Sequence, residues 1–271
     1  MPPAIWLVAT LLGSSATDRS VARQAPAYSA ASVVNAASNQ AGVLAPNTFL
    51  TIYGQNLAWV KRGLQASDIS GDLLPTILSG TGVRVWIGAI AANVYYISPE
   101  QINVLIPSNL KPGATQIRVQ VDSTYGPAIP VTLAKAAPAL FQMNPTTAIA
   151  AHADGSVATE DAPARPGEAI VLYATGLGTT NPPTAYSEIP RDAAPLMDMA
   201  GFEIRFDGKP LEAARIYYAG VAPGFAGLYQ INLKLPDDSG TNPEVRITAS
   251  GATSPEGIRI PLRPDNKPPQ P

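Results

Sequence analysis

The chain has 271 residues, of which 46% are hydrophobic and 14% charged, and its formal net charge is −2. This composition excludes a highly charged disordered chain, and the lack of any Lys/Arg run excludes an electrostatic surface for nucleic acid. Cysteine is absent, which removes disulfides, cysteine-ligated metal sites and thiol chemistry.

The N-terminal end carries an apolar run, Ile5 to Leu12, followed by the small residues Gly13 to Ala16. Such a run is typical of a secretory signal peptide and is too short to span a bilayer. The first four residues contain no Lys or Arg, so an uncleaved apolar tail is the alternative. We expect a signal peptide and N-terminal segment at 1–27, a secreted or cell-surface location, and no transmembrane segment.

Two parts of the chain repeat each other. APNTFLTIYGQNL at 45–57 corresponds to RPGEAIVLYATGL at 165–177, with a separation of 120 positions. Further along, QINVLIP at 101–107 corresponds to QINLKLP at 230–236, with a separation of 129 positions. The order and spacing of the matches indicate a duplicated domain, and the increase in separation places an insertion in the second copy, within Ala219 to Tyr229.

The repeated segments have the two-residue period of β-strands. Tyr229, Ile231 and Leu233 fall on one face of such a strand, and Gln230 and Asn232 fall on the other. Pro, Gly, Asn and Asp bound these segments, and no stretch keeps a helical period. About seven short strands in each copy predict an all-β protein of two tandem immunoglobulin-like β-sandwiches.

The strand pattern places the two sandwiches at 28–134 and 135–263, with a Pro-rich tail at 264–271. The segment that joins them carries the apolar residues Leu140, Phe141 and Met143. We expect these three side chains to pack between the sandwiches, which would hold one sandwich rigidly against the other.

Several motifs of the chain match a known group of proteins. They are VNAAS at 34–38, YISP at 96–99, APALF at 137–141, LYATGLG at 172–178 and AGVAPGFAGLYQIN at 219–232. By these motifs the repeat unit resembles an IPT/TIG-type immunoglobulin-like fold. The region 32–263 is similar to an uncharacterised domain family at the C-termini of large secreted proteins of certain soil bacteria. The sequence around Asp154 departs from that family's pattern. The resemblance implies secretion and an immunoglobulin-like fold, and it implies no established activity.

The sequence offers little for catalysis or metal binding. A hydrolase triad needs a nucleophile, a base and an orienting acid, but the single histidine, His152, lies in a turn-like stretch and is expected to be a solvated surface residue. Two carboxylate pairs, Glu160-Asp161 and Asp237-Asp238, lie in predicted surface turns. A calcium site near either pair is the alternative, although the regular calcium-loop spacing is missing. We predict no enzyme, no cofactor and no metal.

Aromatic residues in loops are the candidates for ligand contact, because large aromatics in loops are enriched at recognition sites. Trp59 lies in the predicted loop from Asn56 to Gly63, and Tyr186 lies in the predicted loop from Asn181 to Pro190. Burial of these two side chains against the end of a sandwich is the alternative. In the pairs Tyr95-Tyr96 and Tyr217-Tyr218 we expect one tyrosine to face the core and the other to face outward.

These observations favour a secreted, non-enzymatic interaction or adhesion module that binds a protein or a glycan. A structural spacer and a carbohydrate-binding module are the alternatives. Function does not follow from the fold, so the ranking depends on the missing catalytic groups and on the resemblance.

Overall fold

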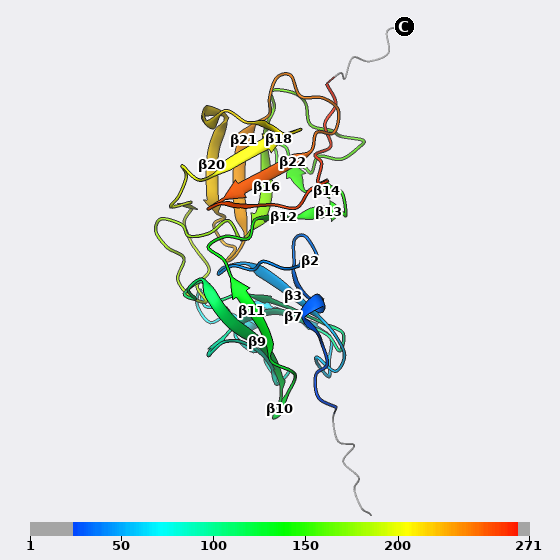
Figure 1. Ribbon diagram of the computed structural model, residues 1–271, viewed down its shortest axis with the longest axis vertical. Helices are drawn as coiled ribbons and strands as arrows, with labels where there is room; N and C mark the ends of the chain where they lie inside the picture. Colours follow the sequence, from blue (N-terminus) through cyan, green and yellow to red (C-terminus); the bar gives the residue numbers. More distant parts are fainter. Residues whose placement is uncertain (1–23, 265–271) are drawn as a thin grey trace, which may run out of the picture.

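A computed structural model describes residues 24–264. Within this range the regular structure consists of β-strands and three short 3-10 helices, η1 (Ala30–Ser32), η2 (Ala66–Asp68) and η3 (Ala213–Arg215). The strands form two sandwiches stacked end to end along the long axis of the molecule (Figure 1). The predicted all-β class and the tandem sandwiches are therefore confirmed. The predicted signal peptide and most of the Pro-rich tail lie outside the described residues.

The first sandwich packs a six-stranded sheet against a five-stranded sheet. The six-stranded sheet has the order β2 (Gln40–Ala41), β1 (Val33–Asn35), β3 (Phe49–Tyr53), β8 (Gln101–Leu105), β7 (Asn93–Ile97) and β4 (Arg62–Gly63). The facing sheet has the order β10 (Thr124–Tyr125), β9 (Gly113–Val121), β5 (Val83–Ile87) and β6 (Ile90–Ala91), with β11 (Ile129–Leu133) paired to β9. Alternate residues such as Ile52, Val85 and Ile102 are fully buried between the sheets.

The second sandwich repeats this plan. Its larger sheet has the order β12 (Ala139–Leu140), β16 (Ala169–Thr175), β21 (Tyr229–Lys234), β20 (Ile216–Val221) and β17 (Ala194–Pro195), with β15 (Ala150–Ala151) paired to β16. The facing sheet has the order β19 (Lys209–Pro210), β18 (Glu203–Phe206), β22 (Val245–Ala249) and β23 (Ala252–Thr253). A small hairpin joins β13 (Gln142–Asn144) and β14 (Thr147–Ala148). Leu172, Ile204 and Ile231 are fully buried in this core.

The correspondence between the sandwiches extends to an irregularity. The strands β3, β8 and β7 correspond to β16, β21 and β20, and each trio contains one β-bulge. The extra residue is Tyr95 in the first sandwich and Tyr217 in the second, because the register shifts between Val94 and Tyr96 and between Ile216 and Tyr218. A bulge sets two residues of one strand against one residue of its neighbour.

These bulges make the expectation of one inward-facing tyrosine in each pair wrong. Tyr96 and Tyr218 lie opposite Asn103 and Asn232, on the outer face of each large sheet. Neither tyrosine of either pair belongs to the core of its own sandwich. The two-residue alternation that we assumed for the pairs is interrupted at the extra residue.

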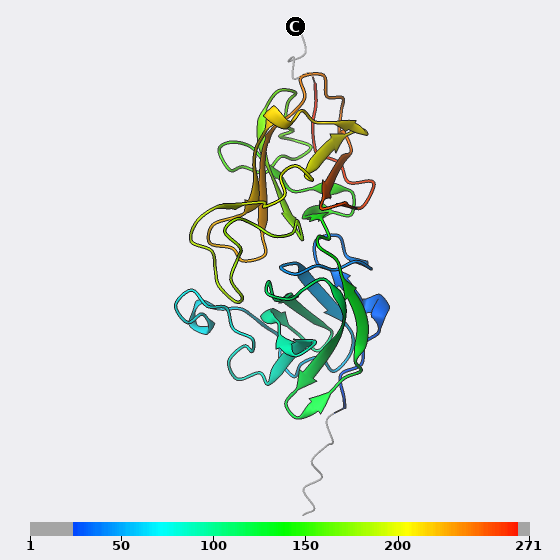
Figure 2. The same ribbon diagram turned by 60° about the vertical axis from the view of Figure 1, so that its left-hand side comes forward.

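The two sandwiches are joined by hydrogen bonds between loops that are far apart in the sequence. In Figure 2 the cyan loop before β5 meets the yellow-green loop before β17. Leu73 and Glu188 form an antiparallel bridge, flanked by hydrogen bonds from Leu74 N to Ser187 O at 2.7 Å and from Ile189 N to Asp72 O at 2.8 Å. A short β-ladder therefore crosses from one sandwich to the other.

An apolar cluster lies beside this ladder. Leu74, Leu105 and Ala226 are buried there, and Phe49, Leu64, Tyr95 and Ile189 pack around them. Phe141 of the joining segment also contacts Phe49, with the ring centroids 6.1 Å apart. Leu140 belongs instead to the core of the second sandwich, and Met143 is 44% exposed. The expectation for the joining segment is thus confirmed for Phe141 and wrong for Leu140 and Met143, because the strand of this segment turns its alternate residues into the second core and into solvent.

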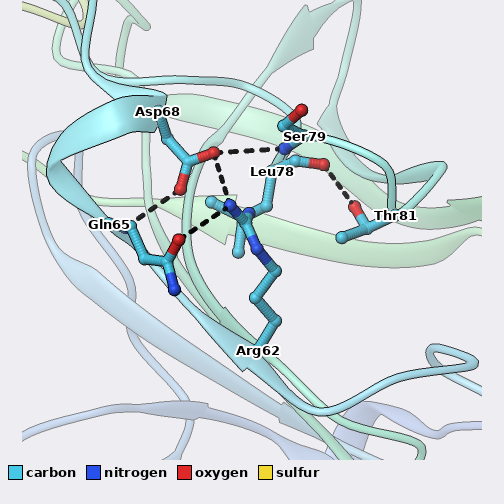
Figure 3. A network of polar contacts seen from close by, with 6 residues as sticks. All are labelled: Arg62, Gln65, Asp68, Leu78, Ser79 and Thr81. Carbon is cyan, nitrogen blue, oxygen red and sulfur yellow. Dashed lines mark hydrogen bonds and ion pairs between the residues drawn. The ribbon is translucent and has the colours of Figure 1, made fainter.

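A polar network around Asp68 lies in the loop between β4 and β5 (Figure 3). The same part of the first sandwich carries Leu64 and Leu74 of the apolar cluster. The Asp68 carboxylate, with its side chain 1% exposed, lies 2.8 Å from Arg62 Nη2. It also accepts hydrogen bonds from the backbone N–H groups of Gln65 and Ser79. This network closes the loop between β4 and β5 and holds its apolar residues at the junction with the second sandwich.

Replacing Asp68 by Asn is expected to lower the free energy of unfolding at pH 7 by about 1–3 kcal/mol, since a charged acceptor of several hydrogen bonds is lost. The hydrogen bond from Arg62 holds the pKa of the Asp68 carboxyl below its usual 3.8. The stabilisation is therefore present above pH 3.8 and is lost as the pH falls through the lowered pKa. Urea unfolding at pH 7 and below pH 3 measures this. The exposed Asp161→Asn is the control, and a destabilisation that is equal at both pH values would contradict the prediction.

Candidate functional site

The side chain of Trp59 holds the end of the first sandwich together. It lies in the loop between β3 and β4, as predicted, and packs half-buried against the first core. Its Nε1 donates a hydrogen bond to Asp122 Oδ2 at 3.1 Å. Both the ring and its polar atom therefore have contacts inside the protein. The contact of Trp59 with a ligand stays a prediction.

Tyr186 links the two sandwiches. It lies in the loop before β17, and its hydroxyl donates to Ala91 O of the first sandwich at 2.7 Å. The neighbouring Ser187 Oγ accepts a hydrogen bond from Asn93 Nδ2 at 2.8 Å. The structure thus places Trp59 and Tyr186 at different parts of the molecule, and it does not bring them into one site. The ligand contact of Tyr186 also stays a prediction.

The predicted carboxylate pairs lie on the surface. Glu160, Asp161, Asp237 and Asp238 are all exposed. The Asp237 carboxylate lies 2.5 Å from Arg215 Nη2, and this hydrogen bond lowers the pKa of Asp237. Within residues 24–264 no group of three or more His, Asp or Glu side chains is arranged to hold a metal ion.

His152 is not the solvated residue that the sequence predicts. Its side chain is 18% exposed, and Nδ1 lies 2.5 Å from Glu168 Oε1. The contact arises because His152 follows β15 and Glu168 precedes β16, and these two strands pair. The hydrogen bond to Glu168 raises the pKa of His152 above its usual 6.5. The arrangement is an ion pair of the second sandwich.

Replacing Glu168 by Gln is expected to lower the pKa of His152 towards 6.5, because the carboxylate that favours the imidazolium is removed. A raised pKa in the folded protein means that the pair stabilises the fold below pH 6.5 and that this contribution is lost as the pH rises through the raised pKa. An NMR titration of the single histidine reports the pKa directly. Glu160→Gln, an exposed carboxylate nearby in the chain, should leave it unchanged; an equal shift in both variants would contradict the role of Glu168.

A cleft of about 390 Å³ lies between the sandwiches. Asn47, Lys135, Leu177, Met197 and Asp198 are among the residues that line it. Met197 is 58% exposed, whereas Asn47 is buried and hydrogen-bonded to Tyr229. The lining contains no aromatic side chain, so the cleft lacks the aromatic anchors that dominate recognition sites.

A regular polar surface lies on the outer face of the large sheet of the first sandwich. Gln101 and Asn103 lie on its central strand β8, with Tyr53 of β3 opposite Gln101 and Tyr96 of β7 opposite Asn103. Gln101 Nε2 donates to Asn103 Oδ1 at 2.9 Å. Two side-chain amides are therefore flanked by two tyrosines, one on each neighbouring strand.

The second sandwich carries the same arrangement. Gln230 and Asn232 lie on β21, with Tyr173 of β16 opposite Gln230 and Tyr218 of β20 opposite Asn232. Gln230 Nε2 donates to Asn232 Oδ1 at 2.8 Å. We call these two surfaces the amide–tyrosine faces: Tyr53, Tyr96, Gln101 and Asn103 form the first, and Tyr173, Tyr218, Gln230 and Asn232 form the second.

The chemistry of the two faces is that of a neutral hydrogen-bonding surface. Amide groups donate and accept hydrogen bonds, and tyrosine offers an apolar ring with a polar tip. Along β3, β7 and β8 no outward-facing side chain is charged, and along β16, β20 and β21 the single charged one is Lys234. Neither face contains a nucleophile beside a general base. The amide and phenol groups of this arrangement are suited to hydrogen bonding with a neutral partner.

The sequence contained a signal for these faces that the search for loop aromatics missed. The motif Gln-Ile-Asn occurs in both copies, and its polar residues point away from the core. A core needs only the inward residues of a strand, so burial does not account for an identical outward pair in both copies.

The fold defines the protein as a tandem of immunoglobulin-like sandwiches. Residues 32–134 match the model of the IPT/TIG domain family. The match covers the first sandwich and less than half of the chain. No curated protein matches the sequence. Among residues 24–264 no helix has the length and apolar character needed to cross a membrane.

Several solved structures resemble parts of the chain. A surface glycan-binding protein of Prevotella bryantii is 12% identical, with 88% of this chain and 42% of that chain covered and a TM-score of 0.28. A Bacteroides ovatus protein, SGBP-B from a mixed-linkage glucan utilization locus, is 12% identical, with coverage of 82% and 43% and a TM-score of 0.32. The γ-CGTase of Bacillus clarkii is 13% identical, with coverage of 79% and 22% and a TM-score of 0.26. The chain spans less than half the length of each, and TM-scores this low carry no argument about its ligand.

Proposed function

We propose that this chain is a non-enzymatic interaction or adhesion module that acts outside the cell, and that its binding surfaces are the two amide–tyrosine faces. We also propose 28–134 and 135–263 as its two structural units. The observation that supports the function is the presence of the same four outward side chains at corresponding positions of both sandwiches. Many polar residues can occupy the outer face of a half-exposed sheet, so packing alone does not call for this identity.

The test of this function is binding to arrays of glycans and of extracellular proteins. The wild-type chain is compared with a variant in which Gln101 and Gln230 are both Ala. We expect the wild-type chain to bind ligands of one class, either glycans or proteins. The double variant should no longer bind them. Ligand released from the wild-type chain should be chemically unchanged. Failure to bind on either array, or chemical conversion of the ligand, would overturn the proposal. Loss of binding in Trp59→Ala or Tyr186→Ala, with the double glutamine variant unaffected, would move the site to the loops.

A structural spacer is the second candidate, and the end-to-end stacking of the sandwiches favours it. The first described residues, in blue, and the last, in red, lie at opposite ends of the molecule (Figure 1). The ladder and the apolar cluster between the sandwiches hold this arrangement. A spacer needs no ligand, so a chain that binds nothing on either array, yet unfolds as one rigid unit, would favour this candidate over the first.

A further inference from the structure

We propose that the two amide–tyrosine faces bind one neutral polysaccharide chain, each face contacting a different stretch of the polymer. This inference rests on the proposed function and adds to it the chemical class of the ligand and the way in which it is held.

The four side chains that define each face are uncharged, and this selects the class of ligand; the one outward charge on these strands is Lys234 at the end of β21. A phosphate or carboxylate ligand is bound by Arg or Lys, often in bidentate geometry, and the outward side chains of the first face include neither. Sugar hydroxyls are neutral donors and acceptors, which match side-chain amides and phenols. In each face one amide hydrogen bond is already made, from Gln to Asn, which orients the amide groups that remain for a ligand.

Particular atoms of the faces are available to hydroxyl groups. Asn103 Oδ1 already accepts hydrogen bonds from Thr51 Oγ1 at 3.1 Å and from Gln101 Nε2 at 2.9 Å. Within residues 24–264 no partner is found for Asn103 Nδ2 or Gln101 Oε1. A donor and an acceptor are therefore offered side by side. Tyr53 is 39% exposed next to them, so its ring can pack against the apolar face of a sugar.

The size of each face fits a short stretch of a sugar chain. Two outward residues of one strand are about 7 Å apart, and neighbouring strands are about 4.8 Å apart. Each face is consequently about 10 Å across, the scale of one or two sugar rings. The faces lie on the outer surfaces of the sheets, so a single face is expected to bind weakly, because affinity depends on well-packed, desolvated anchors.

The duplication compensates for this weakness. A polysaccharide repeats the same unit, so a molecule that carries the same face twice can bind one polymer at two places. The second contact then occurs at a high effective concentration, which can raise the overall affinity by about 10²–10⁴-fold. The ladder between Leu73 and Glu188 fixes the two faces relative to each other, which reduces the entropy lost on binding.

The test compares oligosaccharides and polymers with single-face variants. The probes are amylose, a soluble β-glucan and a galactomannan, with alginate and polygalacturonate as anionic controls, and short oligosaccharides cut from each. Gln101→Ala removes an amide of the first face, and Gln230→Ala removes an amide of the second. Gln116→Ala, an exposed amide on β9 in the other sheet of the first sandwich, is the matched control. Thermal unfolding checks that every variant is folded.

We expect at least one neutral polymer to retard the wild-type chain in affinity electrophoresis and the anionic polymers not to do so. Each single-face variant should bind that polymer about 10²-fold more weakly. With the short oligosaccharide, calorimetric titration should give a stoichiometry that falls from two to one, with the affinity of the remaining site unchanged. Gln116→Ala should behave as the wild type.

Three results would overturn the inference. Retardation by the anionic polymers instead of the neutral ones would exclude the neutral class. Equal affinity of the wild type and the single-face variants for the polymer would exclude the use of both faces. Binding of an extracellular protein, lost in the double glutamine variant while no polysaccharide binds, would exclude the polysaccharide and leave the proposed interaction module in place.

Discussion

Replacing Tyr229 by Ala is expected to lower the free energy of unfolding by about 3–5 kcal/mol, the cost of removing a buried aromatic side chain together with the cavity that it leaves. Tyr229 is 0% exposed and belongs to the core of the second sandwich. Its hydroxyl donates to Gly178 O at 2.5 Å and accepts from Asn47 Nδ2 at 3.1 Å. Because Asn47 belongs to the first sandwich, the truncation removes a core side chain and a contact between the sandwiches at once.

Tyr229→Phe separates these two effects. The ring stays in the core, while Gly178 O and Asn47 Nδ2 lose a partner in a buried place, which is expected to cost about 1–3 kcal/mol. Burial raises the pKa of Tyr229 to about 12, so the hydroxyl remains a donor and both costs should be independent of pH between 5 and 9. Urea unfolding of the three proteins measures the costs. An Ala variant no less stable than the Phe variant would show that the ring contributes nothing.

The strands could be predicted because one face of each sheet packs against a hydrophobic core, which makes apolar and polar residues alternate along the strand. The alternation of Ile102 and Val104 with Gln101 and Asn103 fixes which residues are buried, and a shift of one residue would expose the apolar set. The same pattern fixed the outward direction of the Gln-Ile-Asn residues, so half of each amide–tyrosine face was present in the sequence. The outward tyrosine expected in each pair is present as Tyr96 and Tyr218, but Tyr95 and Tyr217 do not face their own cores, because no local pattern in the sequence indicates a bulge.

Apart from Phe141 of the joining segment, the contact between the sandwiches could not be predicted, because it lies where the two copies differ. Phe49 and Leu105 are paired across β3 and β8 and belong to the apolar cluster. The corresponding pair in the second copy is Ala169 and Lys234. Comparison of the two repeats identifies the residues that both copies share. This interface depends instead on apolar residues that are present in the first copy alone.

The difference between the two copies at this apolar face affects which sandwiches can pair with each other. If every sandwich carried both an apolar face and the loop that covers it, each sandwich could bind the next one head to tail. Contacts of this kind that do not close into a ring form open chains. Here the apolar face occurs on the first sandwich, and the loop that covers it comes from the insertion of the second. The substitution of Ala169 and Lys234 for Phe49 and Leu105 leaves the second sandwich without the same face. The second sandwich therefore does not present the same apolar pair to a further sandwich.

The insertion itself provides the sharpest test of the interface, through Gly227. Gly227→Ala is expected to separate the unfolding of the two sandwiches into two transitions. An added Cβ would lie 2.2 Å from Leu105 Cδ1 and 3.2 Å from a ring carbon of Phe49. Forcing a methyl group into a packed site costs about 1–3 kcal/mol. Here the cost falls on the apolar cluster that joins the sandwiches, while each core stays intact.

Gly224→Ala is the matched control, because it lies in the same loop with a similar φ of +80° against +76° and has nothing within 4 Å of an added Cβ. Both variants carry the strain of alanine in the left-handed region, about 1–2 kcal/mol, and the overlap with Leu105 occurs in Gly227→Ala alone. Differential scanning calorimetry should therefore give one transition for the wild type and for Gly224→Ala, and two for Gly227→Ala. Two transitions in the wild type would mean that the ladder and the cluster do not couple the sandwiches. Identical scans for the two variants would mean that backbone strain alone explains the effect.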